Sequence, residues 1–555
     1  MIDDKCIEEI VDKYFKQNNI LTAHQITTYD NFIDVIFPKI LSQFFPIELE
    51  FKDNSKIKSL TMNIKNLSIN PPYYTENNGC SKIMTPNIAR LRNFTYSLTI
   101  VGTVSIIINV FDNHIIQLPE KEIHNVVITR IPIVVKSKYC TYKKNIDSEC
   151  HLDPGGYTII NGNEKVLISQ EKIAPNIIQV YNVNKNASKY SFVSEVKSSN
   201  DDTYGINKPL SIKITGKENL FDNKLYVTFP HVKVDIPLFI LFKSLGCLSD
   251  REMIYYIIDN SGTEIDAKMI NILKNSILEV SEHKTEHDAV KYISKYIHSN
   301  NSFTIDMKIN YCNNIIQKEL LPHLKGNISK LYFLGLMVNR LLKCYLNIDK
   351  PSDRDSYSSK RIETSGVLLG NLTIQGMSKV VKDIKTYLNK EIHSGIWTIN
   401  NNYMDIINDV NISKIIKPSY IENILKGALA TGNWGMKNNI NKQGVSQVLN
   451  RLTFMSTLSH LRRVSTPVDT TGKLIPPRKL HSSQWGYICP TETPEGQSVG
   501  VVKNLSMMCE ITKMNPTESI YATIIDYLIY FDELNLYEYN KLDYIKVFIN
   551  GSWIG

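Results

Sequence analysis

Apolar residues recur at helical spacing near the start of the chain. In Ile7–Phe15 and again in Phe32–Phe45 they return every three or four residues, which places them on one face of a helix. From about Phe51 to Val180 the pattern changes to short runs rich in β-branched residues, such as Leu98–Phe111, which are typical of strands. The first third of the chain therefore predicts amphipathic helices followed by a mostly β region.

The middle of the chain predicts helices. A polar segment at 181–225 is expected to end the β region, and helical patterning follows in Leu238–Ile297 and Asn313–Leu346. A charged stretch at Asp349–Arg361 predicts a joint, and residues 362–425 are helical again. Because 555 residues exceed what one ordinary core organises, this order predicts a multidomain α+β protein.

The positive charge of the chain is concentrated in one segment. The formal net charge is +8, and residues 427–505, which glycine and proline punctuate, hold nine Lys and Arg against three Asp and Glu. The difference of +6 in this one segment is the electrostatic footprint of a phosphate-binding surface. We expect the segment to form an open wall for nucleic acid, with an evenly solvated surface as the plain alternative.

Two adjacent arginines and several polar side chains lie in this segment. A guanidinium can bind phosphate oxygens through two hydrogen bonds, which makes Arg462 and Arg463 candidate ligands of nucleic acid. Ser446–Leu461 is expected to be a helix with a polar face beside Arg463. That face would carry Gln447, Asn450, Ser456, Ser459 and His460. An arginine pair alone is more often a solvated charge pair, so only the concentration of these groups favours a binding site.

Two carboxylates of the basic segment, Glu492 and Glu495, lie at a predicted turn. No nucleophile or cluster of metal ligands lies near them in sequence, so we expect no catalytic residue and no metal site. A carboxylate in a basic field can orient an arginine. We therefore expect Glu495 to pair with Arg478 and to tie the turn to the loop at Asp469–Lys473.

Cysteine usage and hydropathy restrict the location of the protein. The nine cysteines form no C-x-x-C pair and are irregularly spaced, which predicts reduced thiols in an intracellular compartment. The start, MIDDKCIEEIVDKYF, has no signal-peptide core. The longest apolar runs, such as Ile236–Phe242, fall short of the ~20 residues that a membrane span needs, so no membrane partner is expected.

Long, ordered motifs lie in the same basic segment. They are ALATGNWG (Ala428–Gly435), GVSQVLNRLTFMSTLSHLRRVSTPV (Gly444–Val468) and GKLIPPRKLHSSQWGYICPTETPEGQSVGVVKNLS (Gly472–Ser506). In order and spacing they resemble the fork region of the second-largest, β-type subunits of multisubunit DNA-directed RNA polymerases. Upstream, Gly155–Glu171 resembles the protrusion of that family and Phe229–Glu252 resembles its lobe, so the likeness spans nearly the whole chain.

The resemblance implies a division of the chain into five parts. These are the first part of the protrusion at 1–198, the lobe at 199–361, the returning protrusion at 362–426, the fork at 427–505 and the start of an external domain at 506–555. The chain thus resembles the N-terminal half of such a subunit. Its ending, KVFINGSWIG, predicts a strand, a turn and a second strand that is cut short, as in a fragment or a split gene.

The resemblance also implies a role in an assembly. In this family the catalytic Mg²⁺ is held by the largest subunit, so this chain is expected to have no cofactor of its own and to be inactive alone. The implied partners are the DNA template, the nascent RNA, the largest subunit and a chain carrying the C-terminal half. The assembly would act as a nucleotidyltransferase that extends RNA.

The likeness implies roles for individual residues. Those expected beside the RNA–DNA hybrid are Gln447, Asn450, His460, Arg462 and Arg463. Those expected to form the fork loop are Thr470, Thr471, Gly472 and Lys473, with Arg478 and Glu495 as its support.

The spelling GQSVGVVKNLS and the abundance of Asn, Ile and Lys resemble large cytoplasmic DNA viruses, which implies the host cytoplasm, in a viral factory, and the virion as locations. Two alternatives to the polymerase role stay open. A non-catalytic assembly module would have its basic segment buried by protein. An independent nucleic-acid-binding protein would bind DNA in isolation, with a strong dependence on salt.

Overall fold

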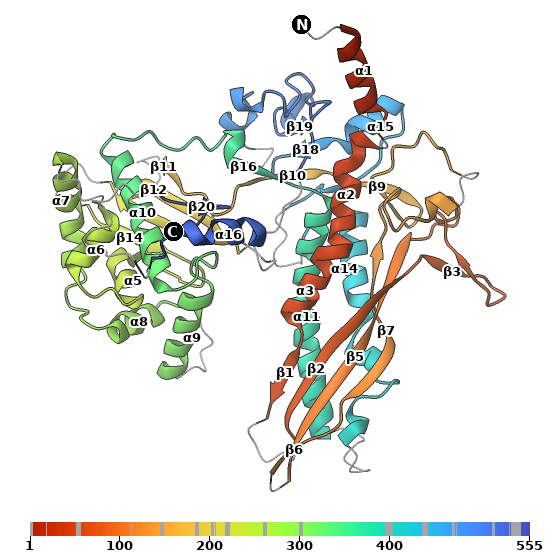
Figure 1. Ribbon diagram of the computed structural model, residues 1–555, viewed down its shortest axis with the longest axis horizontal. Coiled ribbons are helices and arrows are strands. Elements are labelled where there is room, and N and C mark those ends of the chain that lie inside the picture. The colour runs from red at the N-terminus through yellow and green to blue at the C-terminus, as the bar shows by residue number, and fades with distance from the viewer. Residues whose placement is uncertain are drawn as a thin grey trace. The chain divides into compact units, whose positions relative to one another are not determined.

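The structure of the protein is a computed structural model (Figure 1). It describes residues 4–17, 19–51, 57–112, 114–144, 149–183, 188–200, 205, 207–216, 223–258, 263–298, 304–394, 403–435, 442–468, 472, 474–512, 517–531, 533 and 545–555. The predictions for Thr470, Thr471 and Lys473 lie outside these residues. The chain divides into unit 1, Met1–Lys172 with Arg361–Lys513, and unit 2, Ile173–Lys360 with Met514–Gly555.

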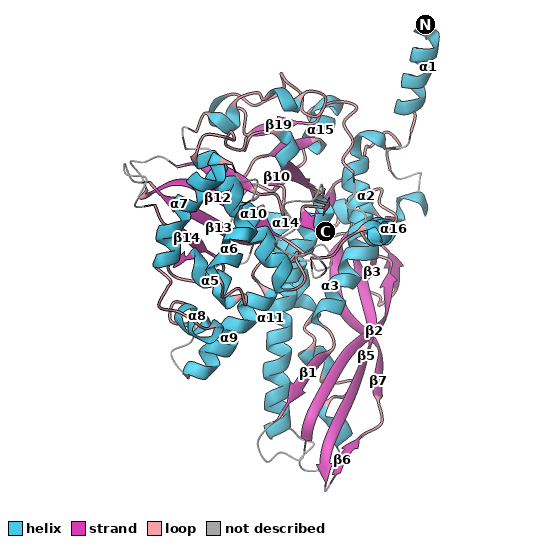
Figure 2. Cartoon of the chain, turned by 60° about the vertical axis from the view of Figure 1, so that its left-hand side comes forward, coloured by secondary structure: helices cyan, strands magenta, loops and turns pink. Residues whose placement is uncertain are grey.

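Unit 1 is built on a five-stranded antiparallel sheet. Its strands are β1 (Ile47–Glu50), β2 (Ile57–Asn70), β5 (Ser97–Asp112), β6 (His114–Gln117) and β7 (Lys121–Pro132). They follow the order β1-β2-β5-β6, with β7 also paired to β5. β5 agrees closely with the predicted strand-like run Leu98–Phe111, and Figure 2 shows β2 and β5 running side by side with β7. Buried residues of the two strands lie opposite each other, as Leu60 does to Ile108.

Helices from both ends of unit 1 pack together beside this sheet. They are α2 (Ala23–Asn31), α3 (Phe37–Phe44), α11 (Ser365–Ser394), α13 (Ile412–Ile415) and α14 (Pro418–Thr431). Unit 1 also has α4 (Pro86–Leu91) and α1 (Asp4–Phe15), which has no buried residue. A Cβ added to Gly366 in α11 would lie 2.0 Å from the carbonyl oxygen of Thr28, so only glycine allows α11 to approach α2 this closely. The Ser365 hydroxyl donates to the Gln25 carbonyl at 2.9 Å. The returning helix α11 is therefore part of the same core as the first helices.

Two small sheets join the basic segment to the earlier part of unit 1. One has the order β17-β9-β8, with β17 at Ser446–Val448, β9 at Asn163–Leu167 and β8 at Thr158–Ile160. The other has the order β16-β10-β18-β19, with β16 at Lys360–Glu363, β10 at Ser169–Ile173, β18 at Arg463–Ser465 and β19 at Val502–Asn504. Between β17 and β18 lies α15 (Phe454–Leu461). Unit 1 also has the hairpin of β3 (Tyr73–Thr75) and β4 (Ser81–Ile83).

Unit 2 combines an antiparallel sheet with helices. Its strands, in the order β11-β12-β13-β14-β15, are Gln179–Asn182, Tyr190–Ser198, Lys208–Thr215, Leu225–Thr228 and Ile236–Pro237. Its helices are α5 (Leu238–Ser244), α6 (Asp250–Ile257), α7 (Glu264–Leu278), α8 (Glu286–Ser294), α9 (Ile305–Lys318), α10 (Asn327–Tyr345) and α16 (Glu518–Ile524). The chain's last strands, β20 (Phe548–Ile549) and β21 (Ser552–Trp553), form a hairpin, and Trp553 belongs to the hydrophobic core of this unit.

The α+β class is confirmed, and the helix α10, most of whose residues are buried, lies within the predicted helical stretch Asn313–Leu346. The prediction that 181–225 ends the β region is wrong, because β12 and β13 lie within it. Burial alternates along β13, so its polar residues face away from the core while Leu210, Ile212 and Ile214 lie in it. The predicted boundary between residues 361 and 362 lies one residue from the point where the chain returns to unit 1. The predicted boundary between residues 198 and 199 lies inside unit 2.

Among the described residues, none of the helices combines the length and the apolar character that a membrane crossing needs.

Candidate nucleic-acid interface

Most of the predicted site residues lie in or next to the segment Ser446–Leu461. This segment consists of a strand, a loop and a short helix, and not of one continuous helix. Ser446–Val448 is the strand β17, whose Gln447 lies opposite Val166 of β9. The helix α15 starts only after Thr453, whose hydroxyl accepts from the Ser456 backbone N–H at 3.1 Å as an N-cap. The predicted helix over Ser446–Leu461 is therefore wrong in its first half, because pairing with a distant strand prevails over local propensity.

Gln447, Asn450 and His460 nevertheless come together. His460 is buried, and its Nε2 lies 2.9 Å from Oε1 of Gln447. Its Nδ1 accepts from the backbone N–H of Asn450 at 3.1 Å. Burial, and then the charge of Arg463, lower the pKa of His460 to about 4, so the ring is neutral at physiological pH. The three residues form one hydrogen-bonded group beside Arg463.

The amide of Asn450 has its oxygen occupied and its nitrogen free. Oδ1 accepts from the Leu452 backbone N–H at 3.0 Å and from the Ser456 hydroxyl at 3.2 Å. The Thr457 hydroxyl donates to the Asn450 carbonyl at 2.7 Å, which fixes the backbone. Within the part of the chain that the structure describes, the NH₂ group of Asn450 has no hydrogen-bond partner.

Arg462 and Arg463 are adjacent but have opposite surroundings. Arg462 is buried, and its guanidinium donates to the carbonyls of Leu21 at 2.7 Å and Ser506 at 2.6 Å, with longer contacts to the carbonyls of Met507 and Cys509. Burial lowers its pKa. The expected place of Arg462 beside the hybrid is therefore corrected: its donors hold three parts of unit 1 together and are not available to phosphate.

Arg463, in contrast, is half-buried and unpaired. Among the described residues, none forms a hydrogen bond or ion pair with its guanidinium, and its Nε is buried without a partner. A buried donor of a charged group without an acceptor is costly, so such a group commonly has a ligand or another role. Arg463 thus stays a candidate ligand of nucleic acid, as the sequence had suggested for both arginines.

Three of the seven described cations of the basic segment pair with carboxylates from elsewhere in unit 1. Lys503 pairs with Glu171 at 3.0 Å, both buried, and Lys442 pairs with Glu363. Burial alone would raise the pKa of Glu363, but Lys172 and Lys442 hold it below its ordinary value. The excess of positive charge counted along 427–505 therefore overstates the charge of an open surface, because part of it is compensated by carboxylates that lie far away in sequence.

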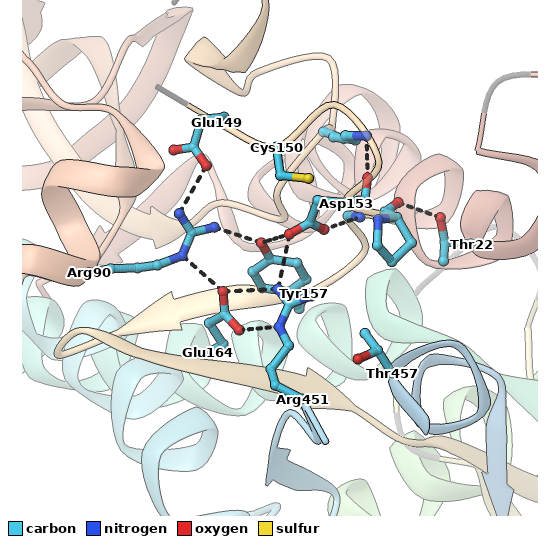
Figure 3. Close-up of polar contacts among 12 residues, drawn as sticks. Thr22, Arg90, Glu149, Cys150, Asp153, Tyr157, Glu164, Arg451 and Thr457 are labelled. Atoms are coloured by element: carbon cyan, nitrogen blue, oxygen red, sulfur yellow. Dashed lines mark hydrogen bonds and ion pairs between the residues drawn. The ribbon is translucent and has the colours of Figure 1, made fainter. Parts of the chain in front are cut away.

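Arg451 belongs to an ion network that sequence reasoning missed (Figure 3). It bonds to Glu164 at 2.7 Å and Asp153 at 3.0 Å, and Arg90 bonds to the same Glu164 at 2.8 Å and to Glu149 at 2.9 Å. The hydroxyl of Tyr157 accepts from Arg90 at 2.7 Å and donates to Asp153 at 2.8 Å. Nothing local in the sequence indicates that Glu164 binds two distant arginines.

Burial alone would lower the pKa of Arg451, but Glu164 and Asp153 outweigh it and hold that pKa above its ordinary value. The network joins the β9 strand, the loop before β8 and the residue that follows Asn450. It therefore fixes the backbone on which the group of Gln447, Asn450 and His460 is built.

Arg478 supports its loop in a different way from the prediction. Its guanidinium donates to the carbonyls of Gln497, Val499 and Gly472, the last at 3.2 Å. In the described part of the chain no ion pair joins it to the exposed Glu495. The turn and the loop at Gly472 are thus tied together by Arg478 as expected, but through backbone carbonyls and not through the carboxylate.

Large apolar side chains are exposed in the same segment. Leu452 in the loop before α15 is 87% exposed and Trp485 is 86% exposed, and Leu474, Ile475 and Leu480 are also exposed. Where such side chains form a contiguous patch, they mark a contact with other molecules. Over the described residues, no group of three or more His, Cys, Asp or Glu could hold a metal ion.

Comparisons with known proteins agree with the motifs. A family model described as RNA polymerase beta subunit matches residues 20–422, and a second one, RNA polymerase Rpb2, domain 3, matches residues 447–511. RNA polymerase II subunit 2 of Arabidopsis thaliana is 34% identical over 98% of this chain and 46% of its own length. Subunit 2 of Acanthamoeba polyphaga mimivirus is 31% identical over 98% of this chain and 46% of its own length.

The chain spans about half the length of these two relatives. It spans nearly the whole length of a third relative. The archaeal subunit Rpo2N of Methanocaldococcus jannaschii is 31% identical over 91% of this chain and 96% of its own length. A viral affinity in particular stays a prediction, because viral and archaeal relatives are equally similar. The chain belongs to the RNA polymerase β subunit family, the second-largest subunits of DNA-directed RNA polymerases, and corresponds to their N-terminal half.

Proposed function

We propose that this chain works as part of a DNA-directed RNA polymerase and that Gln447, Asn450 and Arg463 hold the sugar–phosphate backbone of the RNA–DNA hybrid. We call these three residues the donor edge. One observation carries the proposal: the amide oxygens of the edge are occupied by protein donors, whereas N–H groups remain available on Asn450 and Arg463. Gln447 is exposed, and one of its two amide N–H groups donates to the Gly444 carbonyl.

The chemistry of the edge matches a nucleic-acid backbone. Phosphate oxygens are acceptors, so a surface of donors with one unpaired cation complements them. Contacts of this kind position a strand without reading its bases, as a polymerase requires because it must hold every sequence alike. The edge would thus position the hybrid while the reaction takes place elsewhere.

The catalytic parts belong to other chains in this proposal. Nucleotidyl transfer is performed by the assembly, with Mg²⁺ held by the largest subunit, and the isolated chain is inactive. The long sheet of unit 1 corresponds to the protrusion, the body of unit 2 to the lobe, residues 427–505 to the fork and the last residues to the start of the external domain. The fork would lie beside the DNA template and the nascent RNA.

A role in assembly accompanies this function, because exposed apolar residues lie in the same segment. Leu474, Ile475, Leu480 and Trp485 are suited to protein partners and not to phosphate. The partners would be the largest subunit and the polypeptide that carries the C-terminal half. The internal pairing of the segment's cations gives no support to an independent nucleic-acid-binding protein.

Photocrosslinking separates the two roles. A photoreactive amino acid replaces Gln447 in one reconstituted polymerase and Trp485 in another, each stalled with radiolabelled RNA. We expect crosslinks to RNA from position 447 and crosslinks to protein from position 485. Crosslinks to protein alone from both positions would contradict the hybrid role and leave only the assembly role.

A further inference from the structure

His460 connects the backbone of Asn450 to the side chain of Gln447, and these two contacts together determine where its proton lies. Nδ1 faces the Asn450 backbone N–H at 3.1 Å. A backbone N–H can only donate, so Nδ1 must be unprotonated. The buried ring is neutral at physiological pH and carries one proton, which must then be on Nε2.

The position of this proton determines the orientation of Gln447. Nε2–H of His460 can only donate, and the atom 2.9 Å from it must therefore be the amide oxygen of Gln447. The amide nitrogen is then on the other side, where it donates to the Gly444 carbonyl at 3.1 Å and has a second N–H. A reversed amide would place two N–H donors against each other at His460.

We infer that His460 is a positioning residue, which holds the Gln447 amide so that an N–H group, and not the carbonyl oxygen, is presented to the anionic backbone of the hybrid. The inference rests on the proposed function of the donor edge. His460 itself is buried and does not contact the ligand. Its effect passes through Gln447, since a rotated amide would direct its oxygen at phosphate oxygens and repel them.

Several groups keep this arrangement in place. The Thr457 hydroxyl donates to the Asn450 carbonyl at 2.7 Å, and Arg451 beside Asn450 is bound to Glu164 and Asp153. The backbone N–H that determines the proton position of His460 is thereby fixed. Arg463, the charge next to His460, also disfavours a second proton on the ring.

A double-mutant cycle in the reconstituted polymerase tests the inference. The measured quantity is the rate at which stalled complexes lose their RNA, for His460→Asn, Gln447→Ala and the double variant. Asparagine can still accept from the Asn450 N–H, so this variant preserves the fold. Its side chain is too short to reach Gln447, so the contact with Gln447 is lost. We expect each single change to raise the rate about fivefold, as for one lost hydrogen bond, and the double variant to equal Gln447→Ala alone.

The possible results separate the inference from the function on which it rests. If the two effects multiply in the double variant, or if His460→Asn behaves as the unmodified enzyme while Gln447→Ala does not, the positioning role is contradicted. If Gln447→Ala does not change the rate, the role of Gln447 in the donor edge is contradicted. Gln447→Glu gives a further check: it keeps an acceptor for His460 but has no donor, and should release RNA faster than Gln447→Ala.

Discussion

Two sets of basic residues lie close in sequence and differ in what they bind. The paired cations Lys442, Arg451 and Lys503 are neutralised by carboxylates of unit 1, and Arg462 donates to backbone carbonyls. In the donor edge, Arg463 has no protein partner among the described residues. Every one of these cations counts equally toward the charge of the segment, whichever set it belongs to. In the proposed function, unpaired donors and not net charge would distinguish the binding surface from internal support.

The largest expected effect concerns a paired cation. Lys503→Met would remove the ammonium group that donates to both oxygens of the buried Glu171 carboxylate, at 3.0 and 3.3 Å. Because an uncompensated buried charge is strongly unfavourable, the free energy of unfolding of unit 1 should fall by about 3–5 kcal/mol. Chemical denaturation of the chain measures this change. The matched variant Lys503→Met with Glu171→Leu should recover most of the loss, and a single variant that loses less than about 1 kcal/mol would contradict the pairing.

A second prediction uses the histidine beside Arg462. Burial, and then the charge of Arg462, lower the pKa of His24 to about 4. Between the unfolded value near 6.5 and about 4 the unfolded chain binds the proton and the folded chain does not, so stability is lost as the pH falls through this range. The loss assigned to His24 is at most about 3 kcal/mol. His24→Gln should flatten this part of the unfolding profile; an unchanged slope would contradict the account.

A smaller effect is expected from Arg451→Lys. Lysine keeps the charge but cannot bind Glu164 and Asp153 together, and the site is partly exposed, so we expect a loss of about 1 kcal/mol in the free energy of unfolding. The salt dependence of RNA release should not change, because Arg451 is not part of the donor edge. A changed salt dependence would place Arg451 in contact with the hybrid.

Local pattern was enough to predict elements whose own residues carry a strong apolar signal. The β-branched run of Leu98–Phe111 is the strand β5, and the evenly apolar stretch near Leu331 is the buried helix α10. Ser446–Val448 was mispredicted because its conformation depends on pairing with β9, nearly three hundred residues earlier. The same holds for 181–225, whose strands are stabilised by a core assembled from distant residues.

Part of the membership of the candidate site was predictable from sequence, but its geometry was not. Gln447, Asn450 and His460 do meet, but through the ring of His460 and not through a shared helix face. Sequence could not distinguish Arg462 from Arg463, because the carbonyls that occupy Arg462 come from Leu21 and from residues after Leu505. Glu164 was missed for the same reason: its partners, Arg90 and Arg451, are remote.

The most direct test of the donor edge is the salt dependence of RNA release from reconstituted complexes carrying Arg463→Ala, compared with Lys479→Ala, an exposed lysine outside the edge. We expect Arg463→Ala to speed release roughly tenfold at physiological salt and to lower the slope of log rate against log salt by about 0.7–0.9, the value for one phosphate contact. Lys479→Ala should leave both unchanged. An unaltered rate and slope for Arg463→Ala, in complexes that remain folded and assembled, would contradict the claim that this edge holds the hybrid.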